Sequence, residues 1–286
     1  MSATNLFIFM QKKEYYINSK DGCRLYYRCW EPEGGPVGVI NLVHGFGEHS
    51  GRYNEWAQKF VQAGYAVTAV DYRGHGKADG KRGHASSMQR LLDDIETLLH
   101  LSRQQFPHAP HFLYGHSMGG NLVINYHLRR DRGELKALIV SSPWIKLAFE
   151  ASVFKILLAK MLVHVFPSVV TETNLVVEHI SHDPQVQEAY RADPLVHGFI
   201  SLKLYDVITR GGNFILKNGH RIAIPTLLMH GTADMITSYK ASLYLGYKGR
   251  EKITFKSWPG LYHELHNEYE KEDVFRYIYE WLKKIS

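Results

Sequence analysis

Cysteine is scarce in this sequence, whose 286 residues include two cysteines, Cys23 and Cys29. If the segment RLYYRCW forms a strand, these residues lie roughly 20 Å apart along one extended run, which is too far for a disulfide bond. Disulfides are typical of exported proteins in an oxidising environment. We therefore expect a protein of the reducing cytoplasm.

Long apolar runs are also missing, and a helix that spans a membrane needs about 18 to 20 consecutive apolar residues. The most apolar stretch is FKILLAKMLVHVF, residues 154–166, which contains Lys155, Lys160 and His164. This apolar segment is too short to span a bilayer. As a helix it would be apolar over most of its surface, so it either packs wholly against the rest of the protein or contacts a lipid surface transiently. The second alternative predicts a protein that is peripheral at the membrane.

Dense clusters of basic residues are absent as well. The formal net charge is +6, but the basic residues are scattered and occur together only as pairs such as Lys12-Lys13 and Arg129-Arg130. This distribution argues against nucleic acid as a partner. It leaves a mild attraction to anionic surfaces.

The sequence does contain a regular alternation of strand and helix patterns. A Lys-Asp-Gly turn joins two strands in a hairpin at 14–30, and the later strands are apolar throughout. Apolar strands that alternate with helices predict a mostly parallel eight-stranded sheet covered by helices on both faces. The expected later strands are 37–43, 65–70, 111–114, 135–141, 225–230 and 251–257, and the expected helices are 52–64, 86–106, 121–130, 239–246 and 273–284.

One segment interrupts this alternation, between residues 143 and 222. Its eighty residues are too many for a loop within a compact domain, and they contain short helical patterns such as PQVQEAYRA and SLKLYDVITRG. We expect an inserted helical cap at 143–222 over the C-terminal edge of the sheet. The core domain would then comprise residues 1–142 and 223–286.

The segment LYGHSMGGN contains a G-x-S-x-G pattern centred on Ser117. An apolar strand precedes it and a helix pattern follows, which is the setting of a nucleophile elbow. In such an elbow the serine lies on a sharp, strained turn, and side chains at the flanking positions would collide with neighbouring backbone. The glycines predict that Ser117 is a nucleophile.

A serine hydroxyl is a weak nucleophile unless a base accepts its proton. On this fold the orienting acid and the base follow in the order Ser, Asp/Glu, His. Asp234 lies four residues after the strand that ends at His230, and His263 follows the last strand. Both loops would lie at the same C-terminal edge of the sheet as the elbow, where open α/β sheets build their sites.

Two competitors are close to these positions. His266 lies three residues after His263, in or near the start of the last helix. Asp71 follows the strand 65–70, but its loop DYRGHGKADG is typical of a turn held by local hydrogen bonds. The segment SSPWIKL after the strand 135–141 offers no carboxylate. We therefore predict Ser117, Asp234 and His263 as the catalytic residues.

The stretch HELH at 263–266 differs from the zinc pattern H-E-x-x-H, because its histidines are three and not four residues apart. We expect no metal. The tetrahedral intermediate of acyl transfer needs hydrogen-bond donors for its oxyanion. The glycine-rich loop VHGFGEHSGRY and the elbow would supply the backbone N–H groups of Phe46 and Met118. His44 is expected to shape this loop.

Taken together, the segments HGFGEHSGRY, GHSMGG, HGTADMIT and GLYHELHNE resemble the monoacylglycerol lipase family of α/β-hydrolases. DYRGHGKADGKRGH and ADPLVHGFISLKL are similar to the microbial branch of that family. The resemblance runs from about residue 14 to residue 285. It implies the α/β-hydrolase fold and the hydrolysis of monoacylglycerols to glycerol and fatty acid without a cofactor. It also implies the roles given above for Ser117, Asp234, His263, Phe46 and Met118.

The family's cap covers an acyl tunnel with a small polar end for glycerol, but no motif identifies the residues that hold the glycerol here. The same catalytic machinery serves a lysophospholipase, a broad-specificity carboxylesterase or a small-peptide aminopeptidase. A relative that only binds a ligand would have lost a member of the triad, and all three residues are present. The oligomeric state is left open as monomer or homodimer.

Overall fold

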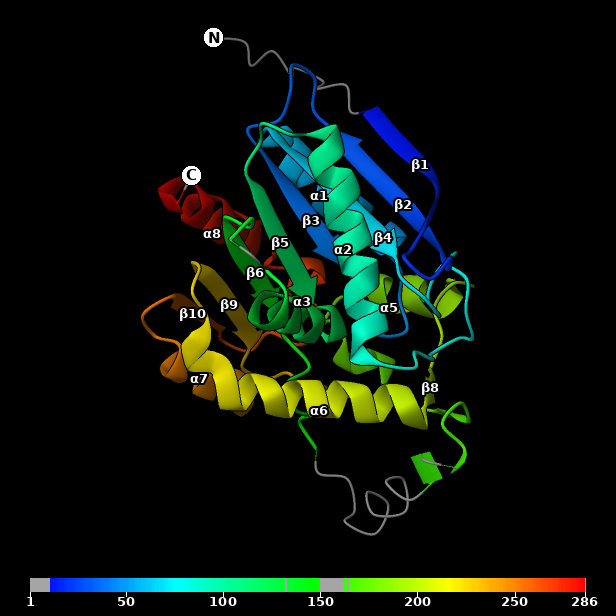
Figure 1. Cartoon of the computed structure of the whole chain (residues 1–286). Coiled ribbons are helices and arrows are strands. Elements are labelled where there is room, and N and C mark those ends of the chain that lie inside the picture. Colours follow the sequence, from blue (N-terminus) through cyan, green and yellow to red (C-terminus); the bar gives the residue numbers. More distant parts are fainter. Residues whose placement is uncertain (1–10, 132, 150–161, 164, 286) are drawn as a thin grey trace.

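A computed structural model describes residues 11–131, 133–149, 162–163 and 165–285. At its centre is an eight-stranded sheet with the order β1-β2-β4-β3-β5-β6-β9-β10 (Figure 1). β2 pairs antiparallel with both β1 and β4, and the remaining neighbours are parallel. The predicted mostly parallel eight-stranded sheet is thus confirmed. The strands are β1 Gln11–Asn18, β2 Arg24–Glu31, β3 Gly38–Val43, β4 Tyr65–Asp71, β5 His111–His116, β6 Ala137–Ser141, β9 Thr226–Gly231 and β10 Ile253–Trp258.

Helices cover both faces of the sheet. Successive side chains of a strand point to opposite faces, so each strand contributes to the cores on both sides. In β3, Val39 and Val43 join the core that also holds the apolar sides of α2, α3 and α7. Ile40 and Leu42, between them, join the core beneath α1 and α8. The helices are α1 Asn54–Gln62, α2 Met88–Gln105, α3 Met118–Arg129, α7 Tyr239–Lys248 and α8 Lys271–Ile285.

The interrupting segment lies between β6 and β9. It contains β7 Val170–Glu172, α5 Pro184–Ala192, β8 Phe199–Ser201 and α6 Leu202–Asn218. The two short strands pair with each other and were not predicted. α6 packs closely on α3 of the core, since a Cβ at Gly211 would lie 2.6 Å from Asn121 Oδ1, and it crosses below α3 in Figure 1. We propose that this segment is the predicted cap, residues 143–222.

The apolar segment 154–166 lies largely outside the described residues, of which it includes 162–163 and 165–166. In the part of the chain that the structure describes, every helix is too short or too polar to cross a membrane.

Candidate active site

Ser117 lies between the end of β5 and the first residue of α3, with φ of 54° and ψ of −117°. This left-handed conformation is unfavourable for a residue with a side chain. The turn is tight on both sides, because a Cβ at Gly115 would lie 2.5 Å from the carbonyl oxygen of Gly119, and one at Gly119 would lie 2.1 Å from that of Val43. The local backbone therefore has the geometry predicted for a nucleophile elbow. α3 begins three residues earlier than predicted, directly after the serine.

The three residues predicted as a triad form one chain of hydrogen bonds. His263 Nε2 lies 2.9 Å from Ser117 Oγ, and His263 Nδ1 lies 2.8 Å from Asp234 Oδ2. The backbone N–H groups of Ile236 and Thr237 donate to the other carboxylate oxygen of Asp234. All three triad side chains are buried. The three loops that carry these residues meet in the folded chain, and the imidazole of His263 lies between the hydroxyl of Ser117 and the carboxylate of Asp234.

The charges in this chain support proton transfer to His263. Burial alone would raise the pKa of Asp234, but the charge of His263 and hydrogen bonds from His230 and His263 hold this pKa well below its ordinary value. Burial would likewise lower the pKa of His263, yet the charge of Asp234 and its hydrogen bond outweigh burial and raise that pKa above its ordinary value. Asp234 is therefore ionised at neutral pH, and it favours the imidazolium that forms when Ser117 gives up its proton.

Asp71, the alternative acid, is committed elsewhere. One of its carboxylate oxygens accepts hydrogen bonds from the backbone N–H and the hydroxyl of Ser50, and the other accepts from the backbone N–H of Lys77. The side chain is fully buried. These bonds tie the loop after β4 to the loop after β3, as expected of a residue that holds turns together.

His266, the alternative base, lies in a short 3₁₀ helix, Leu265–Asn267, before α8. Its ring is stacked on Tyr53, with the ring centroids 4.7 Å apart. Neither ring nitrogen has a hydrogen-bond partner among the described residues, so His266 is not bonded to Ser117 or Asp234. Within the same residues, no group of three His, Cys, Asp or Glu side chains is arranged to hold a metal ion.

The glycine-rich loop after β3 lies against the elbow, since a Cβ at Gly45 would lie 3.2 Å from Ser117 Cβ. His44 Nδ1 donates to the carbonyl of Gly45 at 2.8 Å, and Tyr72, stacked on His44, donates to the same carbonyl at 2.9 Å. Burial lowers the pKa of His44 to about 4, so its imidazole stays neutral. The backbone N–H groups of Phe46 and Met118 have no acceptor within the described residues. Met118 is also the first residue of α3, where N–H groups are free to bind an anion.

A buried ionic group that the sequence did not predict borders the triad. The Arg52 guanidinium binds Glu48 at 2.6 Å and makes two bonds to Glu264, at 2.7 and 2.8 Å. Burial would raise the pKa of Glu264, but Arg52 lowers it to about 2, whereas burial dominates at Glu48 and raises its pKa. The sequence signal was a Glu and an Arg four residues apart beside the glycines, but the third member lies more than two hundred residues away.

A cavity of about 570 Å³ adjoins both the triad and the buried ionic group. Ser117 and His263 line it together with Glu48 and Glu264. Much of the remaining wall is apolar, and much of that comes from the segment between β6 and β9. These apolar residues include Trp144, Leu147, Leu175, Val176, Ile180, Ile200, Leu202 and Tyr205. Ser117 thus lines a space that has both an apolar wall and buried carboxyl groups.

The chain is similar to known proteins over most of its length. A family profile described as serine aminopeptidase, S33, matches residues 34–270. The chain is 34% identical to a monoacylglycerol lipase of Mycolicibacterium smegmatis over 95% of its own length and 97% of that protein. It is 36% identical to an uncharacterized abhydrolase domain-containing protein of Dictyostelium discoideum, covering 90% of this chain but only 27% of that longer protein. A crystal structure of the monoacylglycerol lipase of Paleococcus ferrophilus has a TM-score of 0.81 at 31% identity, covering 98% of this chain and all of that one.

Proposed function

This chain belongs to the family described as serine aminopeptidase, S33, and is a serine hydrolase of the α/β-hydrolase fold; we propose that it cleaves monoacylglycerols to glycerol and a free fatty acid. The observation that carries this proposal is the composition of the cavity around Ser117. Its apolar wall suits an acyl chain, and its buried carboxyl groups, Glu48 and Glu264, suit the hydroxyls of glycerol.

The proposed reaction begins when Ser117 Oγ attacks the ester carbonyl and His263 Nε2 accepts the hydroxyl proton. The backbone N–H groups of Phe46 and Met118 stabilise the oxyanion, and Asp234 stabilises the imidazolium. The intermediate collapses as His263 returns the proton to the leaving glycerol oxygen, which leaves an acyl-enzyme on Ser117. Water then gives a proton to His263 and attacks the acyl carbonyl, and the fatty acid departs. No cofactor takes part in these steps.

The ion pairs of Arg52 favour a substrate with a glycerol head group over one with a phosphate-containing head group. Its guanidinium is already bound by Glu48 and Glu264, so it is not available to a phosphate. An ionised Glu264 repels an anionic group and accepts hydrogen bonds from neutral hydroxyls. This argument favours monoacylglycerols over lysophospholipids, the alternative substrates that the sequence left open.

We expect the enzyme to hydrolyse a monoacylglycerol at least about 100-fold faster, in kcat/KM, than a lysophosphatidylglycerol with the same acyl chain, because its anionic phosphate meets carboxyl groups whose cationic partner, Arg52, is already bound by both of them. Both substrates would be presented in the same detergent micelles and assayed by fatty acid release. A p-nitrophenyl ester of that acyl chain, which has no polar head group, serves as the control for acyl binding. Equal rates on both lipids would contradict the assignment of the head group and leave the serine hydrolase chemistry intact.

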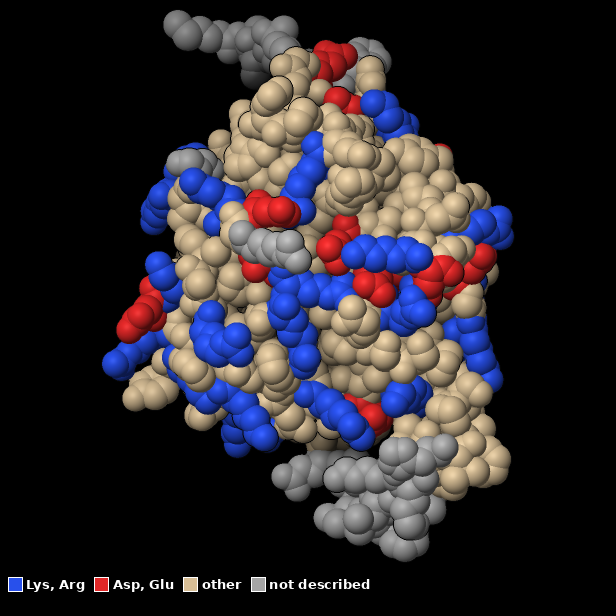
Figure 2. Space-filling view, viewed as in Figure 1, with Lys and Arg blue, Asp and Glu red and all other residues tan. Residues whose placement is uncertain are grey.

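We also propose that the enzyme is cytoplasmic and collects its substrate by transient contact between the cap and a lipid surface. Phe149 lines the cavity and is 59% exposed, and Val165 and Phe166, in the apolar segment, are 67% and 53% exposed. Exposed apolar side chains of this kind favour the lipid–water interface. Figure 2 shows more Lys and Arg than Asp and Glu on the lower part of the face that α6 crosses, which fits an anionic surface.

The double variant Val165→Ser/Phe166→Ser should bind anionic phospholipid vesicles more weakly and turn over long-chain monoacylglycerol more slowly. Hydrolysis of a water-soluble short-chain ester should stay unchanged, since the triad is intact. The control variant is Tyr247→Ser on α7, where the side chain is 70% exposed. Vesicle co-sedimentation and both rates would be measured, and equal losses on the two substrates would rule out the lipid contact.

A further inference from the structure

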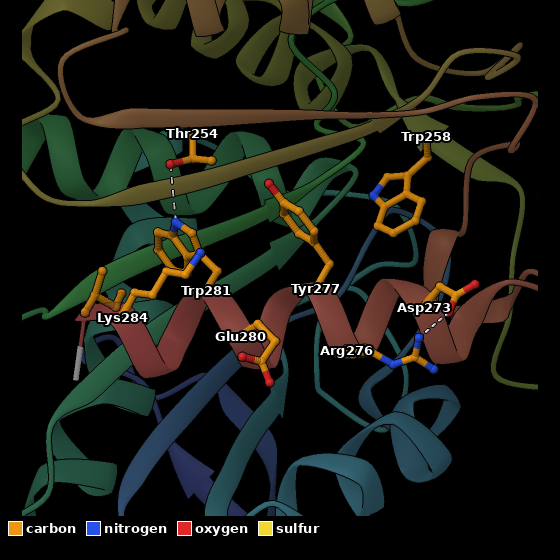
Figure 3. Close-up of a pocket in the computed structure, with 9 residues that line it drawn as sticks. Thr254, Trp258, Asp273, Arg276, Tyr277, Glu280, Trp281 and Lys284 are labelled. Atoms are coloured by element: carbon orange, nitrogen blue, oxygen red, sulfur yellow. Dashed lines mark hydrogen bonds and ion pairs between the residues drawn. The ribbon is translucent and has the colours of Figure 1, made fainter.

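A second hollow of about 560 Å³ lies between β10 and α8, and it shares no lining residue with the cavity at Ser117 (Figure 3). In Figure 3, Tyr277 and Trp281 point from α8 toward β10, while Trp258 reaches toward α8 from the strand. Trp258 and Trp281 are each less than a tenth exposed. The six residues of α8 that carry the argument are Asp273, Arg276, Tyr277, Glu280, Trp281 and Lys284. We call this hollow the α8 groove.

The α8 groove borders an open edge of the central sheet. β10 is the last strand in the sheet order, and within the described residues it pairs with β9 alone. The backbone groups along its outer edge therefore have no neighbouring strand. Thr254 is exposed and the middle of the strand is half-buried. Proteins usually cover or block such edges, so this side of the molecule is suited to contact with another surface.

The charges along the groove alternate in a specific order. Asp273 is negative, Arg276 positive, Glu280 negative and Lys284 positive, from one end of α8 to the other. Reversing the direction of the helix inverts every sign in this series. A copy of α8 laid antiparallel in the groove would therefore place Arg276 opposite Glu280 of the second copy, and Asp273 opposite Lys284.

The spacing of the six residues also reads the same in both directions, with steps of three, one, three, one and three positions. A two-fold axis near the middle of the series, between residues 278 and 279, brings both charge pairs into contact twice. From this self-complementarity we propose that a second copy of the chain docks in the α8 groove and forms a two-fold symmetric homodimer.

The chemistry of the groove suits a protein interface. Aromatic side chains form its floor and charged ones its rim, the arrangement common in interfaces between proteins. A two-fold contact uses the same patch on both subunits. Dimer formation would replace ion pairs that exist within α8, and these are weak. Arg276 pairs with Asp273 and Glu280 with Lys283, and the Arg276 and Glu280 side chains are 70% and 52% exposed, so these surface pairs contribute little.

Sedimentation equilibrium on the full chain tests the proposal. From about 1 µM to about 200 µM, the range of weak interfaces, the mass should rise from the 32.9 kDa of one chain to twice that value. Arg276→Glu places two glutamates in each contact, and Glu280→Arg places two arginines there. Each variant alone should raise the dissociation constant at least about 10-fold, because like charges face each other.

Two combinations make the test specific for the antiparallel pairing. An equimolar mixture of the two single variants should form a heterodimer, because every contact then joins Glu to Arg. The double variant Arg276→Glu/Glu280→Arg should dimerise with itself for the same reason. Lys217→Glu, on α6, makes the same change in net charge as Arg276→Glu but outside the groove, and it should dimerise like the original chain. All variants should keep their circular dichroism and their rate on a soluble short-chain ester.

Three results would overturn the proposal. One is a chain that stays monomeric over the whole concentration range. Another is a dimer that neither single variant weakens, which would place the interface elsewhere. The third is weakening by each single variant without recovery in the mixture and in the double variant, since that pattern would show that Arg276 and Glu280 do not meet across a two-fold axis.

Discussion

Replacing Ser117 with Ala is expected to lower the kcat for ester hydrolysis by a factor on the order of 10⁴ to 10⁶. The variant lacks the oxygen that forms the acyl-enzyme, and no neighbouring group can replace it. Its fold should persist, because among the described residues the side chain of Ser117 makes one hydrogen bond, to His263. The rate on a p-nitrophenyl ester and the thermal unfolding temperature would be measured on the same preparation.

A fluorophosphonate probe supplies an independent check on the same residue. It should label the original chain once, at Ser117, and should not label the Ser117→Ala variant, as mass spectrometry of the digested protein would show. An Ala variant that keeps more than about a tenth of the activity, in a preparation free of contaminating esterases, would show that another residue performs the attack.

The next largest effect is expected from Asp234→Asn, with a loss on the order of 10⁴ in kcat. The neutral amide can no longer stabilise the imidazolium of His263, and it can donate its own hydrogen to Nδ1 and so favour the wrong tautomer. The pH profile should change as well. His263 must be neutral to accept a proton, so activity falls as the pH drops through its pKa.

In the original chain Asp234 raises the pKa of His263, which places the acid limb of kcat/KM above the ordinary histidine value of about 6.5. In the Asp234→Asn variant that charge is gone and burial remains, so the residual activity should persist to lower pH. An acid limb that does not move would show that Asp234 does not control the protonation of His263.

Asp71→Asn is the matched control, because it makes the same chemical change in another buried aspartate. Asp71 accepts three hydrogen bonds that join two loops, and Asn has one acceptor oxygen in place of two. We expect a loss of about 2 kcal/mol in stability, seen as a lower unfolding temperature, with kcat per folded molecule retained. If Asp71→Asn abolished catalysis and Asp234→Asn did not, the acid would be at the end of β4.

The sequence predicts the sheet well because the two patterns that indicate it, apolar strand runs and glycines at the ends of helices, are local. Apolar runs such as VGVINLV and glycine stops such as Gly64 depend on neighbours along the chain. The motif order likewise predicted which loops would meet, since parallel strands bring their carboxyl ends to one edge. The short strands β7 and β8 were missed because three residues are too few to show a period of two.

The ionic group around Arg52 was missed for a different reason. Glu48 and Arg52 are four positions apart, a spacing typical of an ordinary surface ion pair. Glu264 is part of the stretch HELH, whose pattern indicates a role for the histidines and none for the glutamate. Only the folded chain shows that all three are buried together. The charges of α8 posed the same difficulty, since a series of Asp, Arg, Glu and Lys on a C-terminal helix is typical of a face exposed to water.

The backbone conformation of Ser117 has a consequence for laboratory evolution. At φ of 54° and ψ of −117°, glycine is the residue that fits without strain. A library of variants selected for resistance to heat alone should therefore enrich glycine at position 117, and those survivors would be inactive. Any search for a hardier form of this enzyme must score turnover in the same round, because at this position the requirements of durability and catalysis are opposed.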